Sequence, residues 1–171
     1  MTITHILYDL LAYPSYIAPL RAEISAVWNH ETNSARHLTR VDLHKLPKLD
    51  SFLKESERLS PPPRLIAIDG AVQDHDGLTF SDGLHLPHKT YLASNSYGMS
   101  LDRAIYDDLT AFDGLRYYKL RLQRPEQAQR FAYAATDPRE YRVWTWTVCV
   151  YRAGLGGRVL KLLVAYVAYA V

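Results

Sequence analysis

The stretch "LPKLDSFLKESERLSP", residues 46–61, is the most informative part of the sequence for the fold. Pro47 is compatible with the first turn of a helix, whereas the prolines at 61–63 must end one. Between them, apolar residues recur at the spacing of one helical face: Leu49, Phe52, Leu53 and Leu59. We therefore predict a helix over residues 47–59 with one apolar face.

Two charged residues of this helix, Glu55 and Arg58, are three positions apart and share a face. Taken alone, they are typical of a solvated intrahelical ion pair, worth about 0.2–0.5 kcal/mol. A second arginine alters this balance. Arg116 follows a Phe-Asp-Gly turn in "FDGLRYYKLR", residues 112–121.

The two ends of the chain predict further helices. "THILYDLLAYPSYIAPLRAEISAVW" contains two helical patterns separated around Pro14. The final residues, "VLKLLVAYVAYAV", are strongly apolar but interrupted by Lys161, and they fall short of the ~20 residues of a membrane span. We expect a buried helix there.

Between these helices the pattern changes to short strands joined by Gly, Asp and Pro turns. The strand-like segments are "RLIAIDGAV", "GLTFSDGLHLP" and "KTYLASNSYGM". We predict a polar loop with room for a short helix at 29–42, a short helix at 101–112, and a turn leading into polar chain at 113–129. The order of elements predicts a mainly α fold with a minor β-sheet (α+β).

The composition excludes several classes of protein. Hydrophobic residues make up 48% and charged residues 22% of the 171 residues, which is typical of a globular chain. The formal charge of +2 does not favour nucleic acid as a partner. Cys149 is the single cysteine, so there is no intrachain disulfide, and the N-terminus does not have the pattern of a signal peptide.

The helix at 47–59 closely resembles the K helix of fungal cytochrome P-450 monooxygenases, with their Glu-x-x-Arg motif at Glu55 and Arg58. Residues 78–121, "LTFSDGLHLPHKTYLASNSYGMSLDRAIYDDLTAFDGLRYYKLR", resemble the sheet and the Phe-x-x-Arg-type segment that follow it in that family. "THILYDLLAYPSYIAPLRAEI" resembles the end of the I helix and the J helix. The resemblance runs from Thr4 to Arg121 and implies the C-terminal portion of a cytochrome P-450-like fold, with residues 1–171 as a single partial domain.

The resemblance also implies roles and partners. Glu55, Arg58 and Arg116 would form a buried structural triad that braces the haem-binding core, because two arginines can share one carboxylate. The implied cofactor is haem, and the implied activity is oxygen-dependent oxidation of a small hydrophobic metabolite with electrons from a reductase. Members are usually anchored in the endoplasmic-reticulum membrane. Without an anchor in this sequence, we expect a cytoplasmic location.

The sequence departs from the family pattern at four places. We expect the oxygen-activating part of the I helix, and everything before it, to be absent. Gly70 stands where relatives often have an arginine that contacts a haem propionate, and Lys89 replaces the glycine of a Pro-x-Gly-Thr turn. The glycines of the Phe-Gly-x-Gly-x-x-x-Cys-x-Gly haem loop are missing around Cys149, which leaves the region 143–159 degenerate.

Cys149 therefore has two interpretations. It is the candidate axial haem ligand, or it is a small apolar residue in the alternating stretch "VWTWTVCV". The alternation favours the second. His85 and His88 could be metal ligands, but we predict that they lie in a turn of the sheet. "GLGG" at 154–157 could be a phosphate loop, but we predict an irregular turn there.

The codons of this stretch offer an explanation for the missing loop. Trp has a single codon, so reading residues 143–151 one base later forces two glycine codons and permits Phe-Gly-His-Gly-Arg-Tyr-Ala-Cys. The recovered cysteine would fall at Val150. Our hypothesis is that roughly residues 143–159 are read out of frame, through a mispredicted intron or a sequencing error. The genomic DNA tests it.

Two functions follow from the sequence. One is a haem-thiolate monooxygenase-like protein, of which this chain would be a truncated and inactive form. The alternative is a non-catalytic remnant or partner-binding fragment that does not hold haem, in which the I, K and L helices would expose apolar surface. The sequence does not indicate the substrate, the regiochemistry or the oligomeric state.

Overall fold

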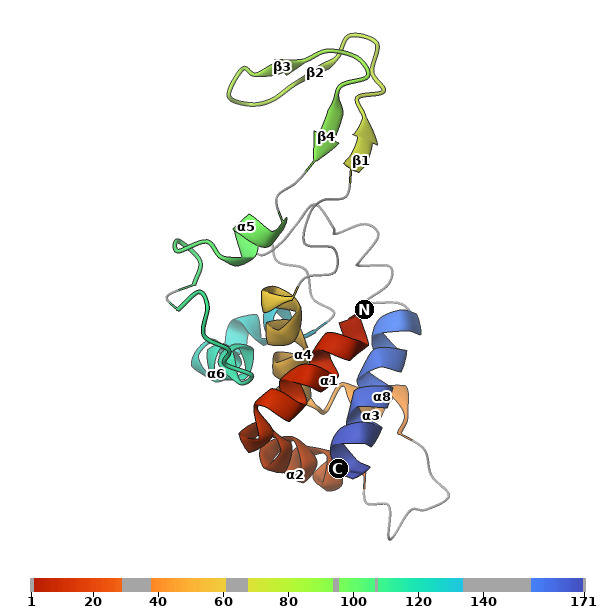
Figure 1. The fold of residues 1–171 in the computed structure, drawn as a ribbon, viewed down its shortest axis with the longest axis vertical. Helices are drawn as coiled ribbons and strands as arrows, with labels where there is room; N and C mark the ends of the chain where they lie inside the picture. Colours follow the sequence, from red (N-terminus) through yellow and green to blue (C-terminus); the bar gives the residue numbers. More distant parts are fainter. Residues whose placement is uncertain are drawn as a thin grey trace.

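The computed structural model describes residues 2–28, 38–60, 68–93, 96–106, 108–133 and 155–170. Helices and two small sheets follow one another along the chain (Figure 1). The elements are α1 (Thr2–Ala12), η1 (Pro14–Tyr16), α2 (Ile17–Val27), α3 (Arg40–Leu43), α4 (Pro47–Leu59), β1 (Ile68–Ala71), β2 (Leu78–Thr79), β3 (His85–Leu86), β4 (Tyr91–Ala93), α5 (Ser96–Ser100), α6 (Arg116–Gln123), η2 (Pro125–Phe131) and α8 (Leu155–Ala170).

The terminal helices follow the sequence prediction. Pro14 occupies the first turn of η1, where its missing N–H costs nothing, and this short 3-10 turn separates α1 from α2. At the other end of the chain, α8 runs beside α1 (Figure 1). Val164, Ala165 and Ala168 of α8 are buried in the core. The predicted helices at both ends are thus confirmed.

The main core joins α1, α2, α4 and α8 into one apolar cluster. Leucine and isoleucine supply most of it, and aromatic rings close its edges. The buried members are Ile6, Leu10, Leu20, Ile24, Trp28, Leu38, Leu43, Leu46, Leu49, Phe52, Leu53, Tyr133, Val164, Ala165 and Ala168. Because α4 contributes to this cluster and to the contacts with α6, it is the element on which the other helices converge.

Helix α4 begins at Pro47, as predicted, and its first turn is capped by a side chain from another helix. The carboxylate of Glu23 accepts the amide N–H groups of Lys48 at 2.8 Å and Leu49 at 3.0 Å, which are donors that the helix leaves unpaired. Burial raises the pKa of Glu23, although these hydrogen bonds and nearby lysines oppose the shift. The cap therefore fixes the start of α4 against α2.

Every residue of α4 from 49 to 58 is buried, including its charged ones. Of the predicted apolar face, Leu49, Phe52 and Leu53 are fully buried, whereas Leu59 is only half-buried. The interpretation of Glu55 and Arg58 as a solvated ion pair is wrong, because both side chains lie inside the protein. A helix this polar is stable inside a fold only where its charged groups find partners.

The strands form two small antiparallel sheets that extend away from the helices (Figure 1). β1 pairs with β4, with an irregularity between Ile68 and Gly70, and β2 pairs with β3. Gly70 lies opposite Leu92 in the first pair. Strands form within each of the three predicted segments, as a minority of a mainly helical chain, but the end of the third segment forms helix α5 instead.

The turn between β3 and β4 places a lysine where the backbone favours glycine. Lys89 has a φ of 67°, in the left-handed region that costs a residue with a Cβ atom about 1 kcal/mol. The amide of Thr90 donates to the carbonyl of Pro87 at 3.1 Å and closes the turn. Lys89 thus occupies a backbone conformation that favours glycine.

Of the predictions for residues 101–129, the turn before Arg116 is confirmed and the others are wrong. Turns and bends, and no helix, occupy the described residues of 101–112, because several backbone carbonyls there accept hydrogen bonds from arginine side chains. The polar chain expected at 113–129 forms α6 and η2 instead. The sequence of α6 has little helical periodicity of apolar residues, because only one of its residues, Tyr117, is buried.

The loop predicted at 29–42 is described from residue 38 onward. Its short helix is α3, which Thr39 and Asp42 cap reciprocally: the Asp42 amide donates to the Thr39 hydroxyl and the Thr39 amide to the Asp42 carboxylate. In the part of the chain that the structure describes, no helix has both the length and the hydrophobicity needed to cross a bilayer.

Candidate functional site: a buried glutamate and two arginines

Glu55 projects from the C-terminal half of α4 and has no exposed surface. Arg58, one turn later, meets it with a two-pronged contact, in which Nε donates to Oε2 at 2.9 Å and Nη2 donates to Oε1 at 2.8 Å. This fork geometry is the strongest that an arginine and a carboxylate can form. The helical spacing of Glu55 and Arg58 is therefore the basis of a buried pair.

Arg116 brings a second guanidinium to the same carboxylate. Its Nε lies 3.2 Å from Oε1 and 3.3 Å from Oε2 of Glu55, and the amide of Asp113 donates to Oε1 at 3.1 Å. The turn before Arg116 closes tightly on α4. A Cβ atom added to Gly114 would lie 2.7 Å from Cδ2 of Phe52, so only glycine allows this approach.

The remaining arginine donors hold the chain between α5 and α6. Nη1 of Arg58 donates to the carbonyls of Ser100 at 3.2 Å and Leu109 at 2.7 Å. Nη2 of Arg116 donates to the carbonyls of Asp108 at 3.1 Å and Ala111 at 3.2 Å. This segment lacks regular secondary structure, so side chains satisfy carbonyls that a helix would otherwise pair.

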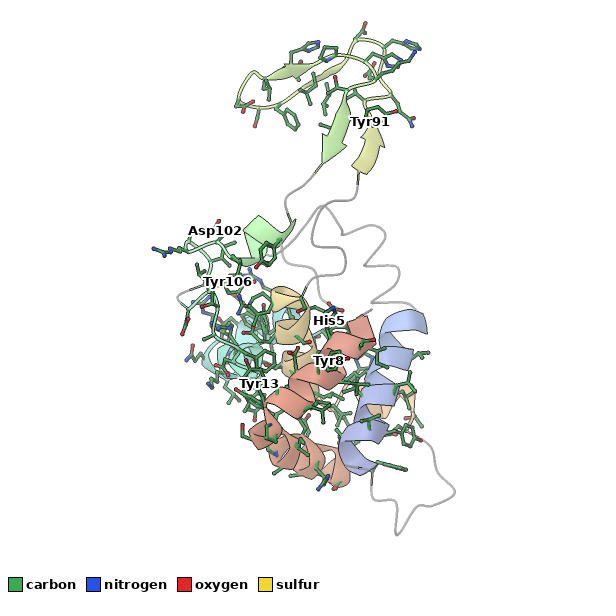
Figure 2. The ribbon with its side chains drawn as sticks, in the orientation of Figure 1. His5, Tyr8, Tyr13, Tyr91, Asp102 and Tyr106 are labelled. Atoms are coloured by element: carbon green, nitrogen blue, oxygen red, sulfur yellow. The ribbon has the colours of Figure 1, made fainter. Side chains whose placement is uncertain are left out.

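Tyrosine rings complete the environment of Arg58. Its guanidinium carbon lies 4.9 Å from the ring centre of Tyr106, which the loop between α5 and α6 places beside α4 (Figure 2). The hydroxyls of Tyr106 and Tyr117 lie 3.3 Å apart. Burial disfavours the charge of Arg58, but hydrogen bonds and the field of Glu55 outweigh it and raise its pKa.

A second set of charged residues on α4 has no counterpart in the sequence predictions. Asp50, Lys54 and Glu57 are buried and share a face of the helix, because they are four and three residues apart. Nζ of Lys161 donates to Oδ1 of Asp50 at 2.6 Å, and the hydroxyl of Tyr133 donates to Oε1 of Glu57 at 2.5 Å. In the sequence, only the helical spacing of Asp50, Lys54 and Glu57 could have indicated that they share a face.

The haem ligand lies outside the described residues. Cys149 and Val150, together with most of the stretch 143–159, fall in the range 134–154, for which no structure is described. The described residues contain no cysteine and no cluster of three or more His, Cys, Asp or Glu residues suited to a metal ion. The described residues therefore contain no thiolate for the haem iron, and we derive no step through haem.

The histidines of the sheet region occupy exposed positions. The Nδ1 atom of His85 lies 2.9 Å from the hydroxyl of Thr79, and Nδ1 of His88 lies 3.0 Å from the carbonyl of Asp74. The rings of His75 and His88 stack with centres 4.7 Å apart. His88 lies in the turn between β3 and β4, as predicted, whereas His85 belongs to strand β3, so the prediction of a turn is wrong for His85. The "GLGG" stretch at 154–157 is mostly helical, because α8 begins at Leu155, so the predicted irregular turn there is wrong.

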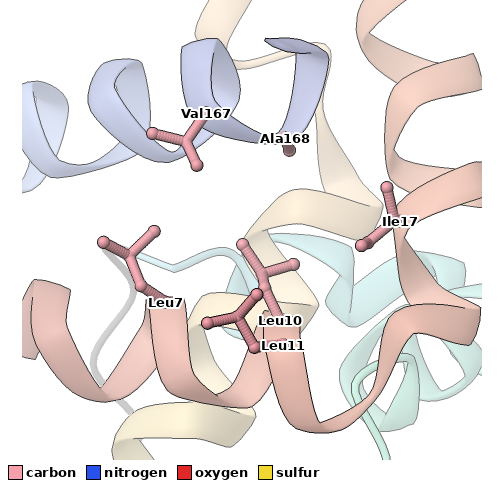
Figure 3. Close-up of a pocket in the computed structure, with 6 residues that line it drawn as sticks. All are labelled: Leu7, Leu10, Leu11, Ile17, Val167 and Ala168. Carbon is pink, nitrogen blue, oxygen red and sulfur yellow. The ribbon is translucent and has the colours of Figure 1, made fainter. Parts of the chain in front are cut away.

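An apolar pocket of about 250 Å³ opens between α1, α2 and α8. Its lining contains no charged side chain and consists of Leu7, Leu10, Leu11, Ile17, Val167 and Ala168 (Figure 3). Nearby apolar residues are exposed, with Leu11 at 70% and Leu163 at 47%. This face of α1 and α8 is available for contact with an apolar partner.

Comparison with known proteins identifies the family. The family model for cytochrome P-450 matches residues 1–134. The chain belongs to the cytochrome P-450 family. A cytochrome P-450 monooxygenase of Emericella nidulans is 40% identical over 137 residues, which are 80% of this chain and 24% of that protein. An ent-kaurene oxidase of Gibberella intermedia is 39% identical over 140 residues, 80% of this chain and 25% of that protein.

A solved structure shows the same fold. A zebrafish cytochrome P-450 determined with abiraterone aligns with 98% of this chain and 35% of its own length, with a TM-score of 0.70 and 19% identity. The mainly helical fold with a small antiparallel sheet is therefore a portion of the cytochrome P-450 fold. The chain spans about a quarter of the length of the curated relatives it matches. The cofactor of the family is haem.

Proposed function

We propose that this chain provides the bracing portion of a haem-thiolate monooxygenase that oxidises a small hydrophobic metabolite with dioxygen. The observation that carries the proposal is the buried cluster of Glu55, Arg58 and Arg116. In this cluster one carboxylate receives two guanidiniums and an amide, and the arginines hold the following segment by its carbonyls. In this role the triad is structural: it positions chain around the haem site and takes no part in the chemistry.

The oxidation itself belongs to the haem, with a reductase as the source of electrons. Two relatives, from Gibberella intermedia and Gibberella fujikuroi, are ent-kaurene oxidases, which supports an apolar organic substrate. Cys149 is the proposed axial ligand of this chain, with Val150 as the position of the cysteine if the stretch 143–159 is restored to the other reading frame.

Haem loading tests this proposal on the chain itself. The 171-residue chain is expressed, mixed with haemin, reduced and exposed to carbon monoxide. A Soret band at the position typical of thiolate-ligated haem, lost in Cys149→Ser, supports Cys149 as ligand. In a second chain, residues 143–159 are recoded in the other frame, which places a cysteine at position 150. A band that appears only in this recoded chain assigns the ligand to that cysteine. Failure of both chains to take up haem specifically contradicts the monooxygenase proposal.

The second candidate, a partner-binding fragment without haem, is favoured by one observation. The apolar pocket between α1 and α8 lies beside exposed leucines and has an almost wholly apolar lining. Sedimentation of the haem-free chain distinguishes the two candidates. A stable monomer that binds haem supports the monooxygenase, whereas a haem-free chain that self-associates, and loses this on Leu11→Lys, supports the alternative.

A further inference from the structure

Helix α8 packs against the core with the less apolar of its two faces. The side chains that it buries belong to Lys161, Val164, Ala165 and Ala168. On the opposite side of the helix, Val159 and Leu163 are 45% and 47% exposed. Hydrophobic stabilisation grows with the apolar area removed from water, so a rotation that buried Val159 and Leu163 instead of two alanines would gain more of it. Hydrophobicity alone therefore does not explain the orientation of α8.

Lys161 is the one charged residue among the side chains of α8 that the structure describes, which are those of residues 159 and 161–168. Its Nζ donates to Oδ1 of Asp50 at 2.6 Å and also to the carbonyl of Leu43. The side chains of Lys161 and Asp50 are each 8% exposed, so both charges are almost completely removed from water. The two acceptors come from α4 and from the end of α3, and together they fix the position of the ammonium.

A rotated α8 would break this pair. Turning the face of Val159 and Leu163 inward moves Lys161 to the solvent side, because these residues lie roughly opposite it on the helix. Asp50 would then stay buried without its counter-charge, which is strongly destabilising. The charge of Lys161 would also move away from Glu23, where burial raises the pKa and this charge is among the groups that oppose the rise. The buried pair therefore penalises the competing orientation.

Two further contacts hold α8 but do not select its face. Nε of Arg21 donates to the carbonyl of Ala168 at 3.4 Å. The last carbonyls of a helix lie on all of its sides, so a rotated helix would offer Arg21 another one. The ring of Tyr166 meets Trp28 edge-on, with ring centres 5.3 Å apart. Apolar contact is not directional, so another apolar side chain of α8 could replace this ring.

We infer that Lys161 and Asp50 form an orientation lock: the pair determines which face of α8 packs against α4, by excluding the rotated helix. The lock also determines which residues of α8 line the apolar pocket, namely Val167 and Ala168 (Figure 3). It consists of contacts within the chain and does not rest on the proposed function. Replacing both charges by apolar residues of similar size should leave a folded chain that has lost its single orientation of α8.

Cysteine accessibility reports which face of α8 is buried. Two reporters are made in the full chain carrying Cys149→Ser: Val159→Cys on the exposed face and Val164→Cys at a fully buried position. Both substitutions replace the same side chain, so they alter the two faces equally. Each reporter is alkylated with N-ethylmaleimide under native conditions. With the lock intact, Val159→Cys should react at least about tenfold faster than Val164→Cys, because a buried thiol reacts only when the structure opens.

The lock is removed by Asp50→Leu combined with Lys161→Met. In this double variant Val164→Cys should react faster and Val159→Cys more slowly than in the parent, because α8 now also buries its other face. A general loss of stability would accelerate the buried reporter without slowing the exposed one. Lys161→Arg keeps the charge and should retain most of the parental difference. Arg21→Met is the matched control, since it removes a contact with the backbone of α8 and leaves the lock in place.

Three results would overturn the inference. The first is a double variant in which Val159→Cys reacts as fast as in the parent. The second is an Arg21→Met variant that shifts both reporters as much as the double variant does. The third is a double variant that circular dichroism shows to be unfolded, because the pair would then be needed for stability rather than for orientation.

Discussion

Helix α4 has two polar faces that differ in what they hold. The face of Glu55 and Arg58 receives Arg116 and, through the arginines, the backbone of the segment between α5 and α6. The face of Asp50 and Glu57 receives the side chains of Tyr133, just after η2, and of Lys161 in α8. The first face concentrates several hydrogen bonds on one carboxylate, whereas the contacts of the second are distributed over two turns. The same helix thus braces two parts of the chain by two different means.

Glu55→Gln should have the largest effect, because it leaves two guanidiniums without their shared counter-charge. Removing one partner from a buried ionic cluster costs about 3–5 kcal/mol of unfolding free energy, a large share of what a domain has. Urea denaturation followed by circular dichroism measures it. Lys119→Met is the control: it breaks a 2.8 Å ion pair of Lys119 with Asp113 near the same turn. Lys119 is 60% exposed, so the control should cost under about 1 kcal/mol. Equal losses in the two variants would show that Glu55 is not specially buried.

Lys161→Met should rank second and tests the other face. The substitution keeps an apolar stem of similar length but leaves Asp50 and the carbonyl of Leu43 without their donor, at a cost of about 2–4 kcal/mol. Asp50→Asn in the same background should add little, since the pair is already broken. The same denaturation experiment measures both. Fully additive losses would mean that Lys161 and Asp50 do not interact.

Gly114→Ala should have an intermediate effect on the triad face. The added methyl group would lie 2.7 Å from the ring of Phe52, so the turn must move and Arg116 with it. Overpacking of this kind costs about 1–3 kcal/mol. Combining it with Phe52→Leu makes room, and the double variant should lose less than the sum of the two single changes. A harmless Gly114→Ala would refute the close approach.

Asp9→Asn should have the smallest effect, visible as a change in pH dependence. Asp9 of α1 accepts a hydrogen bond from the hydroxyl of Ser56 on α4, and burial raises its pKa above the usual 3.8. A raised folded-state pKa gives stability below the ordinary value that is lost as the pH rises through the folded value. As the pH rises above the ordinary carboxyl pKa of 3.8, the wild-type chain should therefore lose stability relative to Asp9→Asn. Parallel stability curves for the two chains would contradict the shift.

The sequence was sufficient for α4 itself but not for its surroundings. Pro47, the prolines at 61–63 and the leucine spacing determine where the helix begins and ends, and Glu55 and Arg58 are adjacent in any helix. Their burial is different, since it depends on Arg116 and on carbonyls of an irregular segment. That segment has no periodic pattern, and so the prediction of a helix at 101–112 was wrong.

The role of Lys161 likewise could not be predicted from the sequence. In the sequence it looks like an interruption of an apolar helix, and no neighbouring residue explains it. Its acceptors lie more than a hundred residues earlier, at Asp50 and Leu43, so only the packing of α8 on α4 shows its role. Cys149 remains a proposed ligand, because it lies outside the described residues.

Hydrogen exchange read by mass spectrometry tests most directly whether the two faces of α4 hold separate parts of the chain. Amide exchange is compared in the wild-type chain, Glu55→Gln and Lys161→Met under native conditions. The two-face account predicts that Glu55→Gln accelerates exchange in residues 100–116 and leaves α8 protected, and that Lys161→Met does the reverse. Acceleration of both regions to the same degree in both variants would contradict it.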